Sequence, residues 1–401
     1  MRTTAMLLAL LLAAAASSKA ETLVVRPDGT GDYTTIWAAV YAADSSDVIE
    51  LTDGTFTGNG NYNIWIYDKE ITIRSQSGSA EACIINPSGG VGEMKRAMSF
   101  DGSGPLCVIQ DITFTGGAAL AGGASDYGGA MKMQSAASPT ITGCIFTGNQ
   151  AGRGGAIFGL NGSEPHIANC IFAENYAVNY GGALCFSSGS QMIEDCTFYG
   201  NVSYDYGGAI VCWNGSTLTI DGCTIHGGSA PDGGSAIWCR SDGSPTVTNT
   251  IIASGMAGGA VACDDPQAAS PTFSCCNIYG NIGGDWAGCI EGMDASDGNI
   301  SADPLFCDAM GADFTLREDS PCVGGTEPNP ECDLIGSQVV GCSSAATHVC
   351  CVQLECQLTA TSAECIVLGG VYHPEWDTCT PNPCATPIIE TSWGSLKALY
   401  R

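Results

Sequence analysis

A pair of glycines recurs along the middle of the chain at almost constant intervals, and this spacing limits the possible folds more than any other feature. The second glycine of each pair is Gly129, Gly155, Gly182, Gly208, Gly234 and Gly259, at intervals of 25 to 27 residues. The same period separates the cysteines Cys144, Cys170, Cys196 and Cys223 and the asparagines Asn149, Asn175 and Asn201. Three markers with one period predict a solenoid of stacked repeats of about 26 residues.

The segments between these markers are short and rich in β-branched residues, as in "PTITGCIF" and "PTVTNTII", with Gly, Pro, Asn or Ser at their ends. They show no apolar period of 3.6 residues, so we predict strands joined by tight turns. The expected fold is therefore all-β, a right-handed parallel β-helix whose coils stack about 4.8 Å apart and bury identical columns.

Each column has a structural explanation that competes with a functional one. Paired glycines suit turns with a positive φ or with no room for a Cβ atom. The cysteines are expected inside the coil, together with the apolar residues two positions later, Phe146, Phe172, Phe198 and Ile225. The asparagines suit a left-handed turn and hydrogen bonds to the asparagines of adjacent coils. We interpret the columns as the framework of the fold rather than as an active site.

A further cysteine column, Cys212, Cys239 and Cys263, follows the Gly-Gly strands in consecutive coils. Neighbours about 4.8 Å apart are within disulfide range, but parallel side chains in register point the same way. Buried free thiols are therefore predicted for these three residues. A metal site is not favoured, because no compact group of His and Cys residues accompanies the column.

The two ends of the solenoid have different sequences. Residues 21–106 are predicted as an N-terminal cap and the first coils, because residues 34–43 offer a Thr N-cap and an apolar helix face. The repeats are predicted to occupy residues 107–300. Residues 301–342 lose the period and are predicted as a C-terminal closure held by disulfides among Cys307, Cys322, Cys332 and Cys342.

Residues 348–384 contain six cysteines and are predicted as a small cysteine-rich module with three disulfides, for which 15 connectivities exist. A zinc site is the alternative, which export and the lack of CxxC pairs do not favour. Residues 385–401 form a C-terminal tail that ends in a basic segment. This tail is interpreted equally as a docking or sorting tag and as a frayed terminus.

Residues 1–20 have the features of a secretory signal peptide, with Arg2, an apolar stretch over residues 6–16 and a cleavage site at residues 18–20. We expect a secreted or cell-surface protein, whose 23 cysteines can form disulfides there. No later stretch is long enough for a transmembrane helix. The net charge of −28 excludes nucleic acid and anionic membranes as expected partners, and polyanionic polymers would need a bridging divalent cation.

The repeats resemble the FxxN and GGA[ILV] units of the chlamydial polymorphic membrane proteins, which are β-helices with adhesive roles. The matching residues are Phe146, Asn149 and 154–157, then Phe172, Asn175 and 181–184, then Phe198, Asn201 and 207–210. This resemblance covers about residues 107–290 and implies the fold and an adhesive role. The opening "LVVRPDGTGDYTTIWAAVYAA" looks like that of pectin methylesterases and other pectin-lyase-like proteins, which implies the fold alone because the esterase's catalytic signatures have no match.

A carbohydrate-active enzyme of the pectin-lyase-like type, either a polysaccharide lyase or a glycoside hydrolase, is the alternative function. Its candidate catalytic residues are Asp205, Asp232, Asp264, Asp265 and Arg240. These carboxylates must converge in one cleft, about 5 to 10 Å apart, for such chemistry. Asp205 and Asp232 are also the candidates for a Ca²⁺ site, against the alternative that they only keep the surface soluble. Residues 107–290 contain three cations, Lys132, Arg153 and Arg240, which is few for a cationic cleft.

Non-enzymatic binding is the favoured function. We expect an adhesin, a glycan binder or a structural protein that recognises extracellular polysaccharide or a cell-surface glycan or protein, without a cofactor. Aromatic side chains along one face are expected to carry recognition, since their rings can stack on sugars. The candidates are Tyr180, Tyr204, Tyr206, Trp213 and Trp238.

Overall fold

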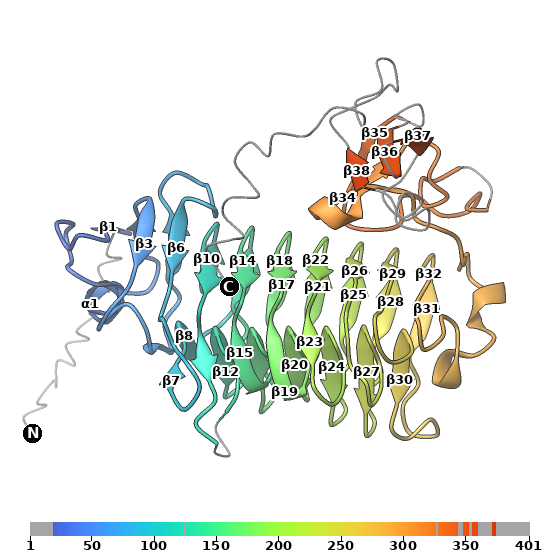
Figure 1. Cartoon of the computed structure of the whole chain (residues 1–401). Coiled ribbons are helices and arrows are strands. Elements are labelled where there is room, and N and C mark those ends of the chain that lie inside the picture. Colours follow the sequence, from blue (N-terminus) through green and yellow to red (C-terminus); the bar gives the residue numbers. More distant parts are fainter. Residues whose placement is uncertain are drawn as a thin grey trace, which may run out of the picture.

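The computed structural model describes residues 19–122, 126–325, 328–343, 348–352, 355–359 and 371–373. Residues 22–279 form a right-handed parallel β-helix, which confirms the predicted fold class (Figure 1). Four sheets, here named A to D, run along the solenoid. A complete coil passes through sheets A, B, D and C in that order.

Sheet A contains β1 (Thr22–Val25), β2 (Val48–Leu51), β5 (Thr72–Ser75), β9 (Val108–Gln110), β13 (Thr140–Thr142), β17 (His166–Ala168), β21 (Met192–Glu194), β25 (Thr219–Asp221), β28 (Thr246–Thr248) and β31 (Thr272–Ser274). Sheet B contains β3 (Gly54–Phe56), β6 (Cys83–Ile85), β10 (Thr113–Thr115), β14 (Ile145–Thr147), β18 (Ile171–Ala173), β22 (Thr197–Tyr199), β26 (Thr224–His226), β29 (Ile251–Ala253) and β32 (Asn277–Tyr279). Sheet C contains β4 (Ile64–Tyr67), β8 (Met98–Asp101), β12 (Met131–Gln134), β16 (Ile157–Gly159), β20 (Leu184–Ser187), β24 (Ile210–Trp213), β27 (Ile237–Arg240) and β30 (Val261–Cys263). Sheet D contains β7 (Met94–Lys95), β11 (Ala118–Ala119), β15 (Gln150–Arg153), β19 (Tyr176–Tyr180) and β23 (Val202–Ser203).

Neighbouring strands in these sheets come from neighbouring coils and pair in parallel, as β14 does with β18, while β7 pairs antiparallel with β11. Equivalent residues of adjacent coils therefore lie one strand spacing apart, about 4.8 Å.

Apolar side chains fill the interior in columns. In sheet B the rings of Phe114, Phe146, Phe172 and Phe198 are buried above one another, with centroids 4.8 to 5.1 Å apart. The cysteines Cys144, Cys170, Cys196 and Cys223 are also buried, and their thiols are free. These stacks bury apolar area between coils and fix the register of the strands.

The asparagine column forms a buried ladder between sheets B and D. The side-chain amide of Asn149 donates to Oδ1 of Asn175 at 3.1 Å, and that of Asn175 donates to Oδ1 of Asn201 at 3.0 Å. The same two oxygens accept the backbone N–H groups of Asn149 and Asn175. The expected left-handed conformation falls on the residue before each asparagine, at Gly148, Glu174 and Gly200. The asparagines are thus selected for their side-chain hydrogen bonds.

The Gly-Gly pairs combine both reasons for glycine. Gly154 has a φ of +61°, and a Cβ atom on Gly155 would lie 2.0 Å from the carbonyl oxygen of Gly182 in the next coil. The first glycine therefore allows the turn, and the second allows the coils to approach each other.

Gly234 is out of register with the other predicted turn glycines. Ile210 pairs with Ile237, so Gly234 is equivalent to the first glycine of the preceding pair, Gly207. Ser235 takes the place of the second glycine and donates its Oγ hydrogen to the carbonyl oxygen of Gly259. This coil is one residue longer than the glycine spacing indicated.

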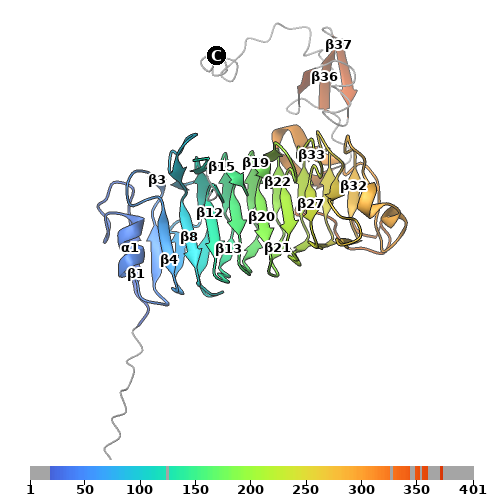
Figure 2. The ribbon, with the colours of Figure 1, turned by 90° about the horizontal axis from the view of Figure 1, so that it is seen from below.

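The helix α1 (Ile36–Ala42) begins where the sequence predicted. Thr35 Oγ1 accepts the backbone N–H of Ala38 at 3.2 Å, and Ile36, Ala39 and Val40 are buried. The helix contacts β1 and β4 at the N-terminal end of the solenoid (Figure 2). Its function as an N-terminal cap stays a prediction.

Residues 286–300 close the opposite end. Ile290 of the 3-10 helix η1 (Gly288–Ile290) is buried, and Trp286 and Met293 pack against the core; Met293 begins a second such helix, η2 (Met293–Ala295). Cys289 of η1 forms a disulfide with Cys263. The prediction of free thiols is therefore wrong for Cys263, while Cys212 and Cys239 are buried and free. The geometric objection fails here because Cys289 belongs to the closing helix and not to a parallel strand.

Residues 301–342 fold back along the outside of sheet B (Figure 1). They form η3 (Ala309–Gly311) and the strands β33 (Phe306–Asp308), β34 (Asp313–Arg317) and β35 (Val340–Cys342). Leu316 and Ile335 are buried with Ile251 of β29. The disulfides join Cys275 to Cys332 and Cys307 to Cys342. Cys322, expected in a disulfide, is a buried free thiol.

The chain beyond the closure is described only in short segments. Strands β36 (His348–Val352), β37 (Glu355–Thr359) and β38 (Val371–His373) form an antiparallel sheet in the order β37-β36-β38. The disulfides predicted for the cysteine-rich module, the tail at 385–401 and residues 1–18 of the signal peptide lie outside the described residues. Within the described part of the chain, no helix has the length and apolarity to span a membrane.

His226 gives the folded-back segment a measurable pH dependence. Its ring centroid lies 5.1 Å from that of Phe314 and 5.8 Å from that of Phe306, and burial lowers the pKa of His226 to about 4. In the unfolded chain His226 is protonated below about pH 6.5, whereas in the folded protein it stays neutral down to about pH 4. The free energy of unfolding is therefore highest above about pH 6.5 and decreases as the pH falls towards 4. We expect His226→Phe to remove up to about 3 kcal/mol of this loss.

Urea unfolding of both proteins at pH 7.5 and pH 4.5 measures the effect. Trp37→Ala, which removes an exposed side chain of α1 and no titratable group, is the control and should leave the pH dependence of the wild type unchanged. Equal losses in wild type and His226→Phe would show that the folded segment does not shield His226.

Candidate functional site

The outer face of sheet C carries a cluster of aromatic and cationic side chains. Strands β24 and β27 supply Trp213, Trp238 and Arg240. The position before each Gly-Gly turn supplies Tyr127, Arg153, Tyr180 and Tyr206, which are joined by bridges between successive coils. We name these seven residues the aromatic–arginine cluster. They cover the outward side chains of Phe158, Cys185 and Val211. Trp238 is itself only 4% exposed, beneath the rings of Tyr180 and Tyr206, so the prediction that it is exposed is wrong.

Both arginines lie against aromatic rings. The guanidinium of Arg153 is 5.4 Å from the ring centroid of Tyr127 and 5.2 Å from that of Tyr180, and Nη1 donates to the Tyr127 hydroxyl at 3.2 Å. The guanidinium of Arg240 is 4.6 Å from the ring of Trp213 and 4.7 Å from that of Tyr180. These are cation–π distances, so the rings hold the two cations in place.

The charges on this face are unusual for so acidic a protein. Arg240 approaches Asp264 at 3.9 Å, whereas none of the ion pairs among the described residues includes Arg153. Lys132 of β12 also lies on the outer face of sheet C, where burial and the charge of Arg96 lower its pKa. All three cations of residues 107–290 are therefore on one face.

Arg96 positions the turn that carries Tyr127. Its guanidinium donates to the carbonyl oxygens of Tyr127 at 2.7 Å and Gly128 at 3.2 Å. Burial lowers the pKa of Arg96 to about 10, which leaves it charged at neutral pH.

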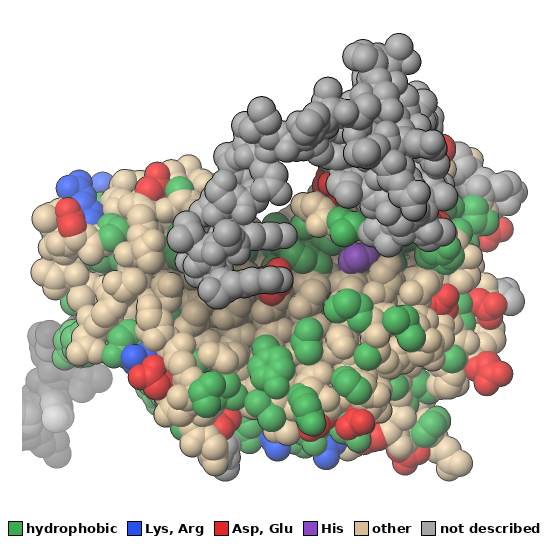
Figure 3. Space-filling view, in the orientation of Figure 1, with side chains coloured by type: hydrophobic (Ala, Val, Ile, Leu, Met, Phe, Trp, Pro, Cys, Tyr) green, Lys and Arg blue, Asp and Glu red, His purple; other side chains and the backbone are tan. Residues whose placement is uncertain are grey.

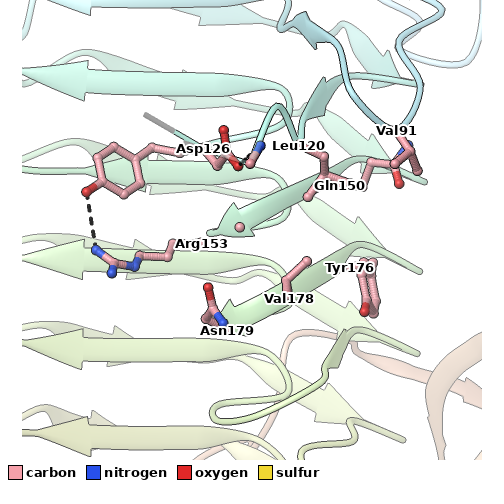
Figure 4. Close-up of a pocket in the computed structure, with 11 residues that line it drawn as sticks. Val91, Leu120, Asp126, Gln150, Arg153, Tyr176, Val178 and Asn179 are labelled. Atoms are coloured by element: carbon pink, nitrogen blue, oxygen red, sulfur yellow. Dashed lines mark hydrogen bonds between the residues drawn. The ribbon is translucent and has the colours of Figure 1, made fainter. Parts of the chain in front are cut away.

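A groove of about 620 Å³ opens beside the cluster over sheet D and shares Tyr127 and Arg153 with it (Figure 4). The other lining residues are Val91, Leu120, Gly122, Asp126, Gln150, Gly152, Tyr176, Val178 and Asn179. A Cβ atom on Gly152 would lie 2.9 Å from the Cβ atom of Asp126, so glycine keeps the groove open at this point.

The groove combines apolar walls with polar groups. The Asp126 carboxylate accepts the N–H groups of Ala121 and Gly122, and Asn179 donates to Asp205 at 3.1 Å. The amide of Gln150 makes no side-chain hydrogen bond to any other described residue and can bind a ligand. In Figure 3 hydrophobic side chains gather over the part of the surface where sheet D lies, with Lys and Arg at its lower edge. A volume of this size fits a small ligand or a few sugar units.

The carboxylates of the enzyme alternative do not meet in one cleft. Asp205 and Asp232 precede strands of sheet C in consecutive coils, where the Asp232 N–H donates to the Asp205 carbonyl oxygen at 3.1 Å. Asp264 and Asp265 follow β30, at the opposite ends of the strands of that sheet. Asp264 lies beside Arg240, and Asp265 accepts the N–H of Gln267. The length of the strands separates the two pairs.

The calcium alternative stays a prediction. Asp205 and Asp232 are neighbours, but no group of three or more His, Cys, Asp or Glu side chains suited to a metal ion occurs within the described ranges.

Four of the five aromatic residues predicted for recognition come together in the cluster. The exception is Tyr204, which is 68% exposed and makes no ring contact with a described residue of the cluster. Tyr127 and Arg153 were not predicted as recognition residues. The position before each Gly-Gly pair, which reads Tyr, Arg, Tyr and Tyr in successive repeats, is the signal that could have revealed them.

A family model agrees with the coil architecture. A family model described as "Right handed beta helix region" matches residues 35–207. Among solved structures, pectin methylesterase from carrot is similar, with 15% sequence identity, a TM-score of 0.34, and coverage of 65% of this chain and 83% of that chain. No curated protein matches the sequence. The strand pairing and the family model define the class of the protein as a right-handed parallel β-helix.

Proposed function

We propose that this protein is an extracellular, non-enzymatic glycan-binding protein, and that the aromatic–arginine cluster with the adjacent groove is its binding site. The observation that carries the proposal is Arg153. It is a half-buried guanidinium held between aromatic rings, outside every ion pair of the described residues, in a protein with a net charge of −28.

Although the net charge of −28 repels polyanions overall, Lys132, Arg153 and Arg240 make this face locally cationic, and it suits a glycan that carries acidic groups without a bridging cation. A guanidinium can bind a carboxylate or sulfate with two parallel hydrogen bonds. The partly exposed rings of Trp213 and Tyr180 offer apolar contacts to sugars beside the two guanidinium groups. In the groove, the amides of Gln150 and Asn179 can hydrogen-bond to hydroxyl groups. The separation of the carboxylate pairs supports binding over cleavage. The adhesive role implied by the chlamydial resemblance is consistent with this function.

Binding to immobilised polysaccharides tests the proposal. The panel contains neutral xylan and laminarin, and acidic alginate, polygalacturonate and dextran sulfate, with and without Ca²⁺. We expect Arg153→Gln to weaken binding to the best acidic polymer about tenfold, because a charge-assisted pair contributes about 1.5 kcal/mol or more. Binding should also weaken at high salt.

Three controls separate the alternatives. Trp37→Ala removes an exposed tryptophan outside the cluster and should bind as the wild type does. Thermal unfolding shows whether Arg153→Gln is folded. Release of reducing ends or unsaturated products from any polymer would instead support the enzyme alternative, and absence of binding to every polymer would contradict the proposed function.

A further inference from the structure

The outer face of sheet C carries a second exposed aromatic pair at its N-terminal end. Trp65 and Tyr67 alternate with buried isoleucines on β4 and are 49% and 65% exposed. Figure 2 shows strands β4, β8, β12, β20 and β27 side by side across this face. The pair is therefore on the same surface as the aromatic–arginine cluster, at the other end of it.

The strand register places the two sites on common lines. One line of equivalent outward positions runs from Trp65 through Ser99, Lys132, Phe158, Cys185, Val211 and Trp238 to Ala262. From Phe158 to Trp238 these residues are buried beneath the aromatic–arginine cluster. Five strand spacings separate β4 from β24, so Trp65 and Trp213 are about 24 Å apart along the solenoid axis. The near edge of the cluster, at Tyr127 before β12, lies closer to β4.

The surface between the two sites is polar. Asp101 of β8 accepts a hydrogen bond from the amide of Gln134 on β12 at 2.7 Å, and Lys132 lies beside them. Lys132 and the Gln134 amide can donate to acidic and hydroxyl groups, and the Asp101 carboxylate can accept from sugar hydroxyl groups. A protein partner or a second copy would instead need a continuous apolar centre to its interface.

We infer that the outer face of sheet C binds one linear, acidic polysaccharide chain along the solenoid axis, with the aromatic–arginine cluster at one end and Trp65 and Tyr67 at the other. This inference rests on the proposed function and adds that the ligand is a long chain that occupies both sites at once. A fragment that reaches only one site loses the gain from simultaneous binding.

Chain length is the variable that tests the inference. The acidic polymer retained best in the panel is used as a tetrasaccharide and as a long fraction, and the affinity of each is measured by calorimetry. For the wild type we expect the long fraction to bind about tenfold tighter or more than the tetrasaccharide, per chain. The double variant Trp65→Ala/Tyr67→Ala should lose this difference and keep the tetrasaccharide affinity.

Matched controls come from equally exposed residues elsewhere. Trp37 on α1 is 49% exposed and Tyr204 is 68% exposed, and neither lies on the outer face of sheet C. Trp37→Ala/Tyr204→Ala should keep the preference for the long fraction. Light scattering on all variants detects self-association.

The outcomes distinguish this inference from the proposed function. If the tetrasaccharide and the long fraction bind wild type equally, or if the double variant keeps the preference, the chain does not reach β4 and the inference is wrong, while the proposed function stands. If the double variant changes only the oligomeric state, the face joins copies of the protein and the inference is overturned. If no polymer binds, the proposed function fails with it.

Discussion

Replacement of Phe172 by alanine is expected to lower the free energy of unfolding by about 3 to 5 kcal/mol. The ring is fully buried and lies between Phe146 and Phe198, with both centroids at 4.8 Å. Because the coils above and below are fixed by their own strands, the cavity cannot close easily and contacts are lost on both sides. Urea unfolding followed by far-UV circular dichroism measures the change.

Phe172→Leu keeps most of the volume and serves as the matched control, with an expected loss of about 1 to 2 kcal/mol. Equal losses for both variants would contradict the account of a rigid stack.

Replacement of Asn175 by alanine is expected to lower the free energy of unfolding by about 3 kcal/mol or more. Its Oδ1 accepts two hydrogen bonds from Asn149, and its amide donates to the Phe146 carbonyl oxygen and to Asn201. Alanine leaves several of these buried groups without a partner, and each such group costs about 1 to 3 kcal/mol.

Hydrogen exchange shows where Asn175→Ala destabilises the protein. The backbone N–H of Asn149, which Asn175 accepts in the wild type, should lose protection in Asn175→Ala. Asn59→Ala, on an exposed loop, should change stability by less than about 0.5 kcal/mol. Unchanged stability of Asn175→Ala would show that water replaces the side chain in the ladder.

The sequence predicted the framework because every coil repeats the same contacts. The columns at Cys144, Phe146 and Asn149 each place one residue type at one position of the coil. The period alone was therefore enough to predict which side chains of adjacent coils stack on each other. The register failed at Gly234 because the extra residue lies inside the repeat, where Ser235 replaces a glycine without disturbing the strands.

The parts without a period could not be predicted in the same way. Cys263 pairs with Cys289, which belongs to the closing helix, so no spacing in the repeats indicates it. Residues 301–342 were expected to close the end, and their contacts with Ile251 and His226 on the outside of sheet B depend on a long-range path of the chain.

The candidate site was predicted in part. Tyr180, Tyr206, Trp213 and Trp238 were predicted to be exposed aromatics, and the coil brings them together because their positions repeat. Trp238 is buried beneath the two tyrosines, because the rings of neighbouring coils stack on it. Arg153 was considered only as a cation for a catalytic cleft. Its place between two tyrosines follows from the position before the Gly-Gly turn, and this becomes visible once that position is compared across coils.

The parallel register has an evolutionary consequence. Duplication or loss of the gene segment for one whole coil would lengthen or shorten the solenoid by one step of about 4.8 Å, and it would leave every other coil with the same neighbours. Such a change between β4 and β16 would alter the reach between Trp65 and Trp213 without altering the chemistry at either end. Homologues with different numbers of coils would then select polymers by length, so that repeat number itself becomes an inherited determinant of specificity.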